Sequence, residues 1–507
     1  MSILSENVAA RRRRLTTESA IKAFFSSNAL VAIVVLALIT IFLFREGFGF
    51  FGQNLANIRL YRRSGLEYVD ILREQGQKQA ALSRRLGEIR QQETRAQPNS
   101  DALAPFDQFA GTFSDSAESL NGLISDANDQ ALALREALIA SGAQSAASST
   151  ESESAASALV SPEQSMTALR TADEKFPKIA EEMKAKIDNL LAAPPVLKNA
   201  KAQKSFETWK QQTQEYVEQL PAVGQRLRQW NPDEPVPAYR AITSFLFGTN
   251  WITASFWQDW YGIIPLLVGS IMVAAVALLI AVPLGVCSAI YVSEVAARGE
   301  KAFIKPYIEF ISAIPSVVLG FFGIAVVGQA IRTLSQMPFM KWVPFFPISE
   351  RLNVFTAGAL LALMAVPTIF TLAEDALRNV PRGFKEASYA LGATRLQTVS
   401  RVLVPASLSG IISAVLLGLG RVIGETMVVL LCAGNRIAIP DFTQGLGAFF
   451  QPVHTMTGII AQEMGEVVRG SIHYRALFMV GLVLFALTLG INYLAQRMVA
   501  RYRMSIG

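Results

Sequence analysis

Long apolar runs alternate with polar stretches along the chain, and they predict six helices able to cross a membrane. The first run, NALVAIVVLALITIFLF, covers 28–44. Five more runs follow Trp257, over 262–293, 305–333, 353–377, 406–433 and 474–496. A bilayer core requires about 20 apolar residues in a helix, and each run approaches or exceeds that length. The pattern therefore predicts an all-α membrane protein with six transmembrane helices.

The segment between the first two runs has the periodicity of amphipathic helices. Apolar residues recur there at steps of three and four, the spacing of a buried helix face. Strong stripes begin at Phe106 and Phe206, and weaker ones at Leu66 and Met166. A four-helix bundle and two long hairpins fit this pattern equally well. Eight Ser and six Ala over 141–161 predict a flexible linker between the stripe that begins at Phe106 and the one that begins at Met166.

The boundaries of these patterns predict the domain organisation. We expect a basic cytoplasmic N-terminus at 1–27, a first transmembrane helix at 28–52, an extracytoplasmic helical insert at 53–255 and a second membrane domain at 256–500. The first apolar run resembles the core of a signal peptide, but no small-residue cleavage site follows it. We therefore interpret it as an uncleaved helix, and Arg11–Arg14 should hold its N-terminus in the cytoplasm.

Composition and charge support this division. The chain is 51% hydrophobic and 17% charged, which excludes a disordered chain, a nucleic-acid-binding tail and a disulfide scaffold. The net charge is −3 over 53–250 and +9 over the rest. The positive charges concentrate in the predicted inner loops at 294–304 and 378–405 and in the C-terminal tail, as the positive-inside rule requires. Both termini are thus expected in the cytoplasm.

The predicted inner loop between the fourth and fifth spans carries the most informative motif. It reads VPRGFKEASYALGATRLQTVSRVLVPAS and should form two short amphipathic helices joined at Gly392. It resembles the coupling loop of ABC importer permeases, with Glu386-Ala387-Ser388, Gly392 and Val404-Pro405 at the family's spacing. The third position is Ser where that motif has Ala. The resemblance implies that 380–405 docks on cytoplasmic ATPase subunits, with Glu386, Ala387, Gly392 and Pro405 as coupling residues.

The fifth span carries two charges inside its apolar run, and charges in a bilayer are costly and usually functional. Arg421 and Glu425 are four residues apart, which predicts that they stack on one face of a helix. Gly418, Gly420 and Gly424 should let another helix approach closely. A guanidinium offers a fork of donors that matches the oxygens of an anion, and Glu425 would neutralise it in the empty state. The alternative is a structural Arg–Glu pair that locks this helix to a neighbour.

The stretch GLGRVIGETMVVLLCAGN around these charges resembles PstC-type permeases of phosphate-specific ABC importers. AVPLGVCSAIYVSEVA, IEFISAIPSVVLGFFG and LAEDALRNVP match the same family. Together with FREGFGFF at the end of the first span, the resemblance covers roughly 28–52 and 250–500. The resemblance implies the ABC permease fold and a phosphate path that includes Arg421, Glu425 and Thr426. It also implies a second permease subunit, two cytoplasmic ATPase subunits, an extracytoplasmic phosphate-binding protein and a place in the bacterial inner membrane, in contact with lipid.

The resemblance implies no cofactor, metal or nucleic acid, and the nucleotide-binding pattern GxxxxGK[ST] is absent. ATP hydrolysis would therefore belong to the partner subunits, and the chain itself should not be an enzyme. Two rival functions stay open: a permease for another oxyanion or small solute, and a membrane-anchored sensor that uses the insert.

Several other residues have structural or surface interpretations. Lys305 and Glu309 are expected to snorkel at the membrane interface, and Glu374 and Asp375 to be solvated at the inner end of the fourth span. Pro283, Pro315 and Pro367 are expected to interrupt the second, third and fourth spans. His454 and His473 are expected to be ordinary surface residues in the outer loop between the last two spans.

Overall fold

The computed structural model describes residues 2–96, 103–146, 162–253, 255, 257–340, 342–343 and 345–502. These residues form two compact units. The membrane unit comprises Met1–Asn54, Ala241–Thr253 and Asp259–Gly507, and the insert unit comprises Leu55–Arg240 and Ala254–Gln258. Almost all secondary structure is helical, and the fold class predicted from the sequence is confirmed.

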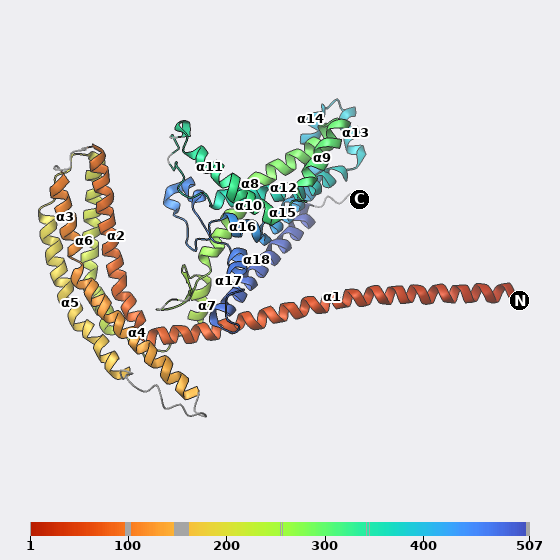
Figure 1. Cartoon of the computed structure of the whole chain (residues 1–507). Helices are drawn as coiled ribbons and strands as arrows, with labels where there is room; N and C mark the ends of the chain where they lie inside the picture. The colour runs from red at the N-terminus through yellow and green to blue at the C-terminus, as the bar shows by residue number, and fades with distance from the viewer. Residues whose placement is uncertain are drawn as a thin grey trace. The chain divides into compact units, whose positions relative to one another are not determined.

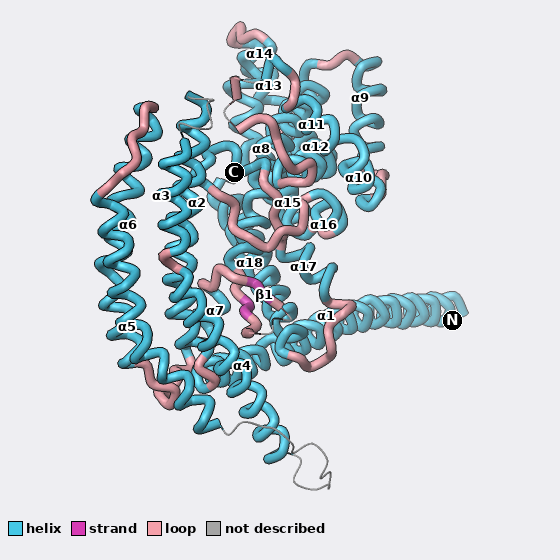
Figure 2. The backbone as a smooth tube through the Cα atoms, turned by 60° about the vertical axis from the view of Figure 1, so that its left-hand side comes forward, coloured by secondary structure: helices cyan, strands magenta, loops and turns pink. Residues whose placement is uncertain are grey.

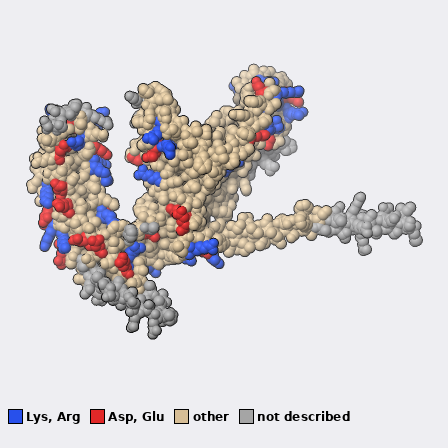
Figure 3. Space-filling model, in the orientation of Figure 1, with Lys and Arg blue, Asp and Glu red and all other residues tan. Residues whose placement is uncertain are grey.

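Six helical segments of the membrane unit are long and apolar enough to cross a membrane. They are Ile21–Arg63, Ile264–Val295, Ser316–Ser335, Val354–Arg378, Arg395–Gly424 and Ile472–Met498. Figure 3 shows a broad uncharged surface on the visible face of this unit, with charged side chains in separate groups around it. The predicted number of spans is therefore confirmed.

Helix α12 (Val354–Arg378) forms the centre of the membrane unit and packs against α8 (Ile264–Ile290) and α15 (Val404–Gly424). Two glycines allow this approach. A Cβ at Gly285 of α8 would lie 2.9 Å from Ile369 Cγ2, and one at Gly418 of α15 would lie 2.7 Å from Ile369 Cγ1. Ile369 itself is fully buried in α12. Small residues thus bring both helices onto the central one, as is common in membrane helix packing.

Two predicted continuous spans are broken in the structure. The stretch 305–333 contains the end of α9 (Arg298–Ile311), a turn, α10 (Ser316–Phe322), a π-helical turn and α11 (Gly328–Ser335). Pro315 explains the first break, because the residue before a proline is disfavoured in the α conformation. The stretch 406–433 contains α15 and the short helix α16 (Met427–Cys432), which are separated by two residues.

The other two prolines do not interrupt their helices, contrary to the prediction. Pro283 lies within α8 and Pro367 within α12, and both helices continue past them. Neighbouring groups in a helical membrane protein can compensate for the hydrogen bond that proline cannot make.

The remaining elements lie at the two ends of the membrane unit (Figure 1). Helices α9, α13 (Arg382–Ala390) and α14 (Arg395–Thr398) gather at one end. Toward the other end lie α7 (Tyr239–Leu246), α17 (Met456–Glu463) and the start of α18 (Ile472–Tyr502). Strands β1 (Trp251–Ile252) and β2 (Trp260–Tyr261) form a short antiparallel pair. The predicted inner loops thus share one end.

Helix α1 (Ser2–Arg63) is continuous from the membrane unit into the insert unit. The most apolar window of its span is entirely unburied by the rest of the chain. Its later residues do pack: Phe50 is fully buried, with its ring centroid 5.2 Å from that of Phe245 in α7.

The insert unit is a bundle of long antiparallel helices (Figures 1 and 2). They are α2 (Leu66–Ala96), α3 (Ala104–Asp115), α4 (Glu118–Ala146), α5 (Pro162–Ala192) and α6 (Ala200–Gln229). The predicted apolar stripes are buried: Phe113 and Trp209, for example, have ring centroids 5.0 Å apart and almost no exposure. Helix α4 extends through the first part of the predicted linker to Ala146, and 147–161 lies outside the described residues.

Candidate substrate path and coupling loop

The fifth span is unwound for two residues beside the predicted Arg–Glu pair. Helix α15 ends at Gly424, and Glu425 has an extended backbone with φ −75° and ψ 132°. The Glu425 side chain turns onward along the chain, where its Oε1 accepts a hydrogen bond from the Met427 backbone N–H at 3.2 Å. The prediction that Arg421 and Glu425 stack on one helix face is therefore wrong, because the helix ends between them. No ion pair within 4.0 Å joins the two among the described residues.

Arg421 lies in the last turn of α15, and its side chain is exposed on the surface of the chain. Its Nη1 donates to the Thr368 hydroxyl of α12 at 3.2 Å. No Asp or Glu of the described residues lies within ion-pairing distance of the guanidinium. A cation at a helix C-terminus is favoured by the helix dipole, and within the described part of the chain only Thr368 accepts a hydrogen bond from the guanidinium. This arrangement can receive an oxyanion.

The other residues of the span leave the same side open. Gly418 contacts Ile369, whereas a Cβ at Gly420 or Gly424 would have no atom within 4 Å. Thr426 is half-buried, and its carbonyl accepts the N–H of Leu430 at 2.9 Å. Within this chain, the small residues near Arg421 thus border open space, which another subunit or a path can occupy.

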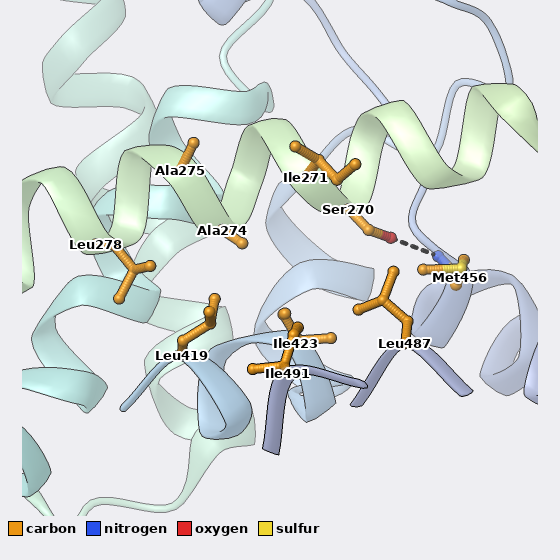
Figure 4. Close-up of a pocket in the computed structure, with 10 residues that line it drawn as sticks. All are labelled: Ser270, Ile271, Ala274, Ala275, Leu278, Leu419, Ile423, Met456, Leu487 and Ile491. Carbon is orange, nitrogen blue, oxygen red and sulfur yellow. Dashed lines mark hydrogen bonds between the residues drawn. The ribbon is translucent and has the colours of Figure 1, made fainter. Parts of the chain in front are cut away.

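A cavity of about 320 Å³ lies near the fifth span, but its chemistry excludes an oxyanion path (Figure 4). It is lined by Ser270, Ile271, Ala274, Ala275, Leu278, Leu419, Ile423, Met456, Leu487 and Ile491. The only side-chain hydroxyl is that of Ser270, which donates to the Leu266 carbonyl and accepts the Met456 N–H. A phosphate ion placed there would lose its hydration without gaining donors.

The predicted coupling loop has the helix–glycine–helix shape expected from the sequence. Helix α13 ends before Gly392, which has φ +81°, and α14 begins at a capping box formed by Thr394 and Gln397. Glu386, Ala387 and Pro405 are exposed, as is Gly392. Leu391 and Leu396 are 89% and 74% exposed, so the tip presents apolar side chains to solvent. Such a surface is suited to docking on another protein.

The structure shows a role for Ser388, which stands where the family motif has Ala. Its side chain is buried, and its Oγ lies 2.9 Å from the Thr398 Oγ1, within hydrogen-bond distance. The Ser388–Thr398 contact ties α13 to the residues that follow the turn. The hydroxyl therefore holds the two halves of the loop together, a role that an alanine could not perform.

Ion pairs attach this end of the unit to the spans. Lys385 of α13 pairs with Glu294 in the π-helical turn that follows α8. Glu374 is fully buried near the end of α12 and accepts from Lys305 of α9 at 2.9 Å. Arg378 Nη2 lies 3.0 Å from Glu374 Oε1, although that oxygen receives no hydrogen bond. Glu374 is thus a paired internal charge rather than the solvated one predicted, and Lys305 has a buried partner besides Glu309, which is 4.0 Å away.

The two histidines also differ from the prediction. His454 is only 2% exposed, its Nδ1 accepts the Thr455 N–H, and its Nε2 lies 3.1 Å from the Gln462 Oε1. Burial lowers the pKa of His454 below its ordinary value, which favours the neutral ring. His473 is half-buried in the first turn of α18, with Nε2 2.7 Å from Glu463 Oε2. Both histidines therefore support local structure.

Comparison with known proteins identifies the family. Residues 281–503 match the model for binding-protein-dependent transport system inner membrane components. The probable ABC transporter permease protein YqgH of Bacillus subtilis is 36% identical over 50% of this chain and 77% of its own length. The phosphate transport system permease protein PstC of Haemophilus influenzae is 33% identical over 52% of this chain and 84% of its own. The chain belongs to the PstC-type permeases of ABC transporters.

The matched region of this PstC-type permease contains both candidate sites. Residues 281–503 include the coupling loop and the unwound turn after Arg421, whereas the insert helices precede that range. A solved structure of the MetNI methionine ABC transporter in an inward-facing conformation aligns with 48% of this chain and 94% of its own, at 20% identity and a TM-score of 0.34. As a permease subunit, the chain is a multi-pass membrane protein.

Sequence reasoning missed two residues near the path. Thr368 of α12 holds the Arg421 guanidinium, and Thr457 of α17 contacts the unwound turn through a hydrogen bond to the Glu425 carbonyl at 3.0 Å. Neither residue has a local signal, because each is a threonine in an apolar or loop-like stretch that only the tertiary fold brings to the fifth span.

Proposed function

We propose that this chain is the transmembrane permease subunit of an ATP-driven importer of inorganic phosphate. The observation that carries the proposal is Arg421: it is exposed in a span, it has no acidic partner among the residues that the structure describes, and it lies beside an unwound turn. Broken transmembrane helices commonly supply the ion and substrate sites of transporters. The relatives named as phosphate permeases support phosphate as the anion.

In this proposal the path is completed by a second, similar permease. Arg421 is exposed in this subunit, Glu425 and Thr426 are half-buried, and Gly420 and Gly424 border open space, which the partner would close. Arg421 binds the anion through paired hydrogen bonds. Glu425, which the structure holds away from Arg421, would compete for the guanidinium in another conformation of the unwound turn and so favour release.

The proposal also assigns partners and orientation. The end with α9, α13 and α14 faces the cytoplasm together with both chain termini, in agreement with the basic loops. The exposed apolar tip at Leu391 and Leu396, with Glu386 and Ala387, docks on one of two ATPase subunits. An extracytoplasmic phosphate-binding protein delivers the substrate to the opposite end.

Uptake by cells that lack this gene distinguishes phosphate from another oxyanion. We expect deletion in a strain without other phosphate importers to abolish high-affinity uptake of labelled phosphate and to leave labelled sulfate uptake unchanged. Expression of the full chain should restore phosphate uptake. Unimpaired phosphate uptake after deletion would contradict the proposal, and a selective loss of sulfate uptake would support the rival oxyanion function.

The insert should be dispensable for transport, because its two ends meet within the membrane unit. Asn54 Nδ2 donates to the Ala241 carbonyl at 2.9 Å, so a short Gly/Ser linker can replace 55–240. We expect this variant to retain phosphate uptake within about threefold of wild type, measured per amount of subunit in the membrane. Loss of uptake with normal membrane insertion would instead place the insert in the transport machinery.

A deletion of the same length, shifted by five residues, provides the matched control. Removing 60–245 also removes Phe245, which is fully buried against Phe50 in the membrane unit. We expect this variant to be degraded or inactive, because loss of a buried aromatic side chain costs about 3–5 kcal/mol. Retained uptake combined with changed regulation in the variant that lacks 55–240 would favour a sensory role for the insert.

A further inference from the structure

The segment before α18, which the sequence analysis assigned to an outer loop, contains the buried N-terminus of a helix. Helix α17 begins at Met456, and residues 453–459 are all buried. The Met456 N–H donates to the Ser270 hydroxyl of α8 at 3.0 Å (Figure 4). The Val453 N–H donates to the Ala433 carbonyl at 2.9 Å. Helix α17 is therefore fixed against both α8 and the end of α16.

Thr457, in the first turn of α17, contacts the unwound turn of the fifth span. Its side chain is 8% exposed, and its hydroxyl donates to the Glu425 carbonyl at 3.0 Å. Because α15 ends at Gly424, this carbonyl is outside a regular helix and requires a donor in its apolar surroundings. The Thr457 hydroxyl supplies that donor.

The direction of a carbonyl reports the orientation of its whole peptide plane, which joins Glu425 to Thr426. A bond that fixes this plane also fixes where the Glu425 side chain leaves the backbone. In the structure that side chain points toward the Met427 N–H and leaves Arg421 without an acidic partner. The hydrogen bond from Thr457 therefore affects whether the Arg421 guanidinium is free to bind an anion.

We propose that Thr457 is a positioning residue of the anion path: its hydrogen bond to the Glu425 carbonyl holds the unwound turn of the fifth span in the conformation that keeps Glu425 away from Arg421. Thr457 acts through Glu425 and does not touch the anion. This inference rests on the proposed function of Arg421, and it adds α17 to the elements that shape the path.

The test compares three substitutions in the full chain with its partner subunits. Thr457→Val removes the hydroxyl and keeps the side-chain shape, and Thr457→Ser keeps the hydroxyl. Ser270→Ala removes the hydroxyl of α8 that accepts the Met456 N–H and so weakens the anchoring of the α17 N-terminus. The readout is the maximal rate of labelled phosphate uptake, normalised to the amount of assembled subunit, together with the thermal stability of the purified complex.

We expect Thr457→Val to lower the maximal uptake rate at least fivefold, with a decrease in thermal stability similar to that of Ser270→Ala, because each variant leaves one backbone group without its side-chain partner. Thr457→Ser and Ser270→Ala should stay within twofold of wild type. Equal losses in Thr457→Val and Ser270→Ala would overturn the inference, because they would show that only the anchoring of α17 matters. Wild-type uptake by Thr457→Val would overturn it as well.

The same series separates this inference from the proposed function. If Arg421→Gln abolishes uptake while Thr457→Val does not reduce it, the path stands and the role of Thr457 fails. If Arg421→Gln transports phosphate normally, the proposed path itself fails and the inference fails with it.

Discussion

Arg421→Gln is expected to abolish phosphate uptake while the subunit still assembles with its partners. Glutamine keeps the polar character of the side chain, but it removes the charge and the forked donors that match a phosphate. A hydrogen bond to a charged group contributes about 1.5–3 kcal/mol, and the lost anion attraction adds to that in a site shielded from water. The side chain is exposed in the subunit and makes one hydrogen bond, to Thr368, so the fold should tolerate the change.

Related variants define what Arg421 supplies. Arg421→Lys keeps the charge without the planar fork, and we expect it to restore uptake only in part. Arg436→Gln is the matched control, since Arg436 is an exposed arginine in the segment that follows α16. It should transport within twofold of wild type. Normal uptake by both Arg421→Gln and Glu425→Gln, measured with labelled phosphate, would refute the path.

Gly392→Val is expected to uncouple or detach the ATPase subunits. Gly392 has φ +81°, a conformation that costs a β-branched residue about 1–2 kcal/mol or more. A Cβ there would meet no atom within 4 Å, so the substitution alters the backbone turn without any steric clash. The expected result is at least a tenfold loss of uptake, accompanied by weaker co-purification of the ATPases or by ATP hydrolysis that no longer depends on substrate.

Gly392→Asn tests the reason for this loss. Asparagine tolerates the left-handed conformation better than other residues with a side chain, so the turn should survive. We expect uptake within about threefold of wild type. Equal, severe losses in both variants would show that the tip requires the absence of any side chain, whereas wild-type behaviour of Gly392→Val would show that the turn does not transmit coupling.

The helical architecture was predictable because burial in lipid imposes a simple rule on the sequence. A segment that spans the membrane must make its backbone hydrogen bonds internally and present apolar side chains to lipid. The six runs could therefore be predicted without tertiary information. The insert helices could be predicted from the apolar stripes that begin at Phe106 and Phe206, because one face of each helix is buried. The turn at Gly392 followed from the conformational freedom of glycine.

The breaks and the buried charges were not predictable from local pattern. The run 406–433 has no charged residue apart from Arg421 and Glu425, and its sequence does not predict the two unwound residues that the contact with Thr457 of α17 supports. Glu374 and Asp375 are neighbours in sequence, yet one is fully buried between cations and the other is exposed. Glu374 is paired with Lys305, which is remote in the chain. Only tertiary contacts therefore determine which of the two carboxylates is buried.

Transport by the purified complex tests the central claim most directly. The full chain is purified with the subunits that accompany it, reconstituted into vesicles and supplied with the phosphate-binding protein outside and ATP at the coupling-loop side. Labelled phosphate should accumulate in the vesicles only with hydrolysable ATP. The Arg421→Gln complex should hydrolyse ATP without accumulating phosphate. ATP-dependent accumulation of sulfate but not phosphate, or equal phosphate accumulation by wild-type and Arg421→Gln complexes, would contradict the proposed function.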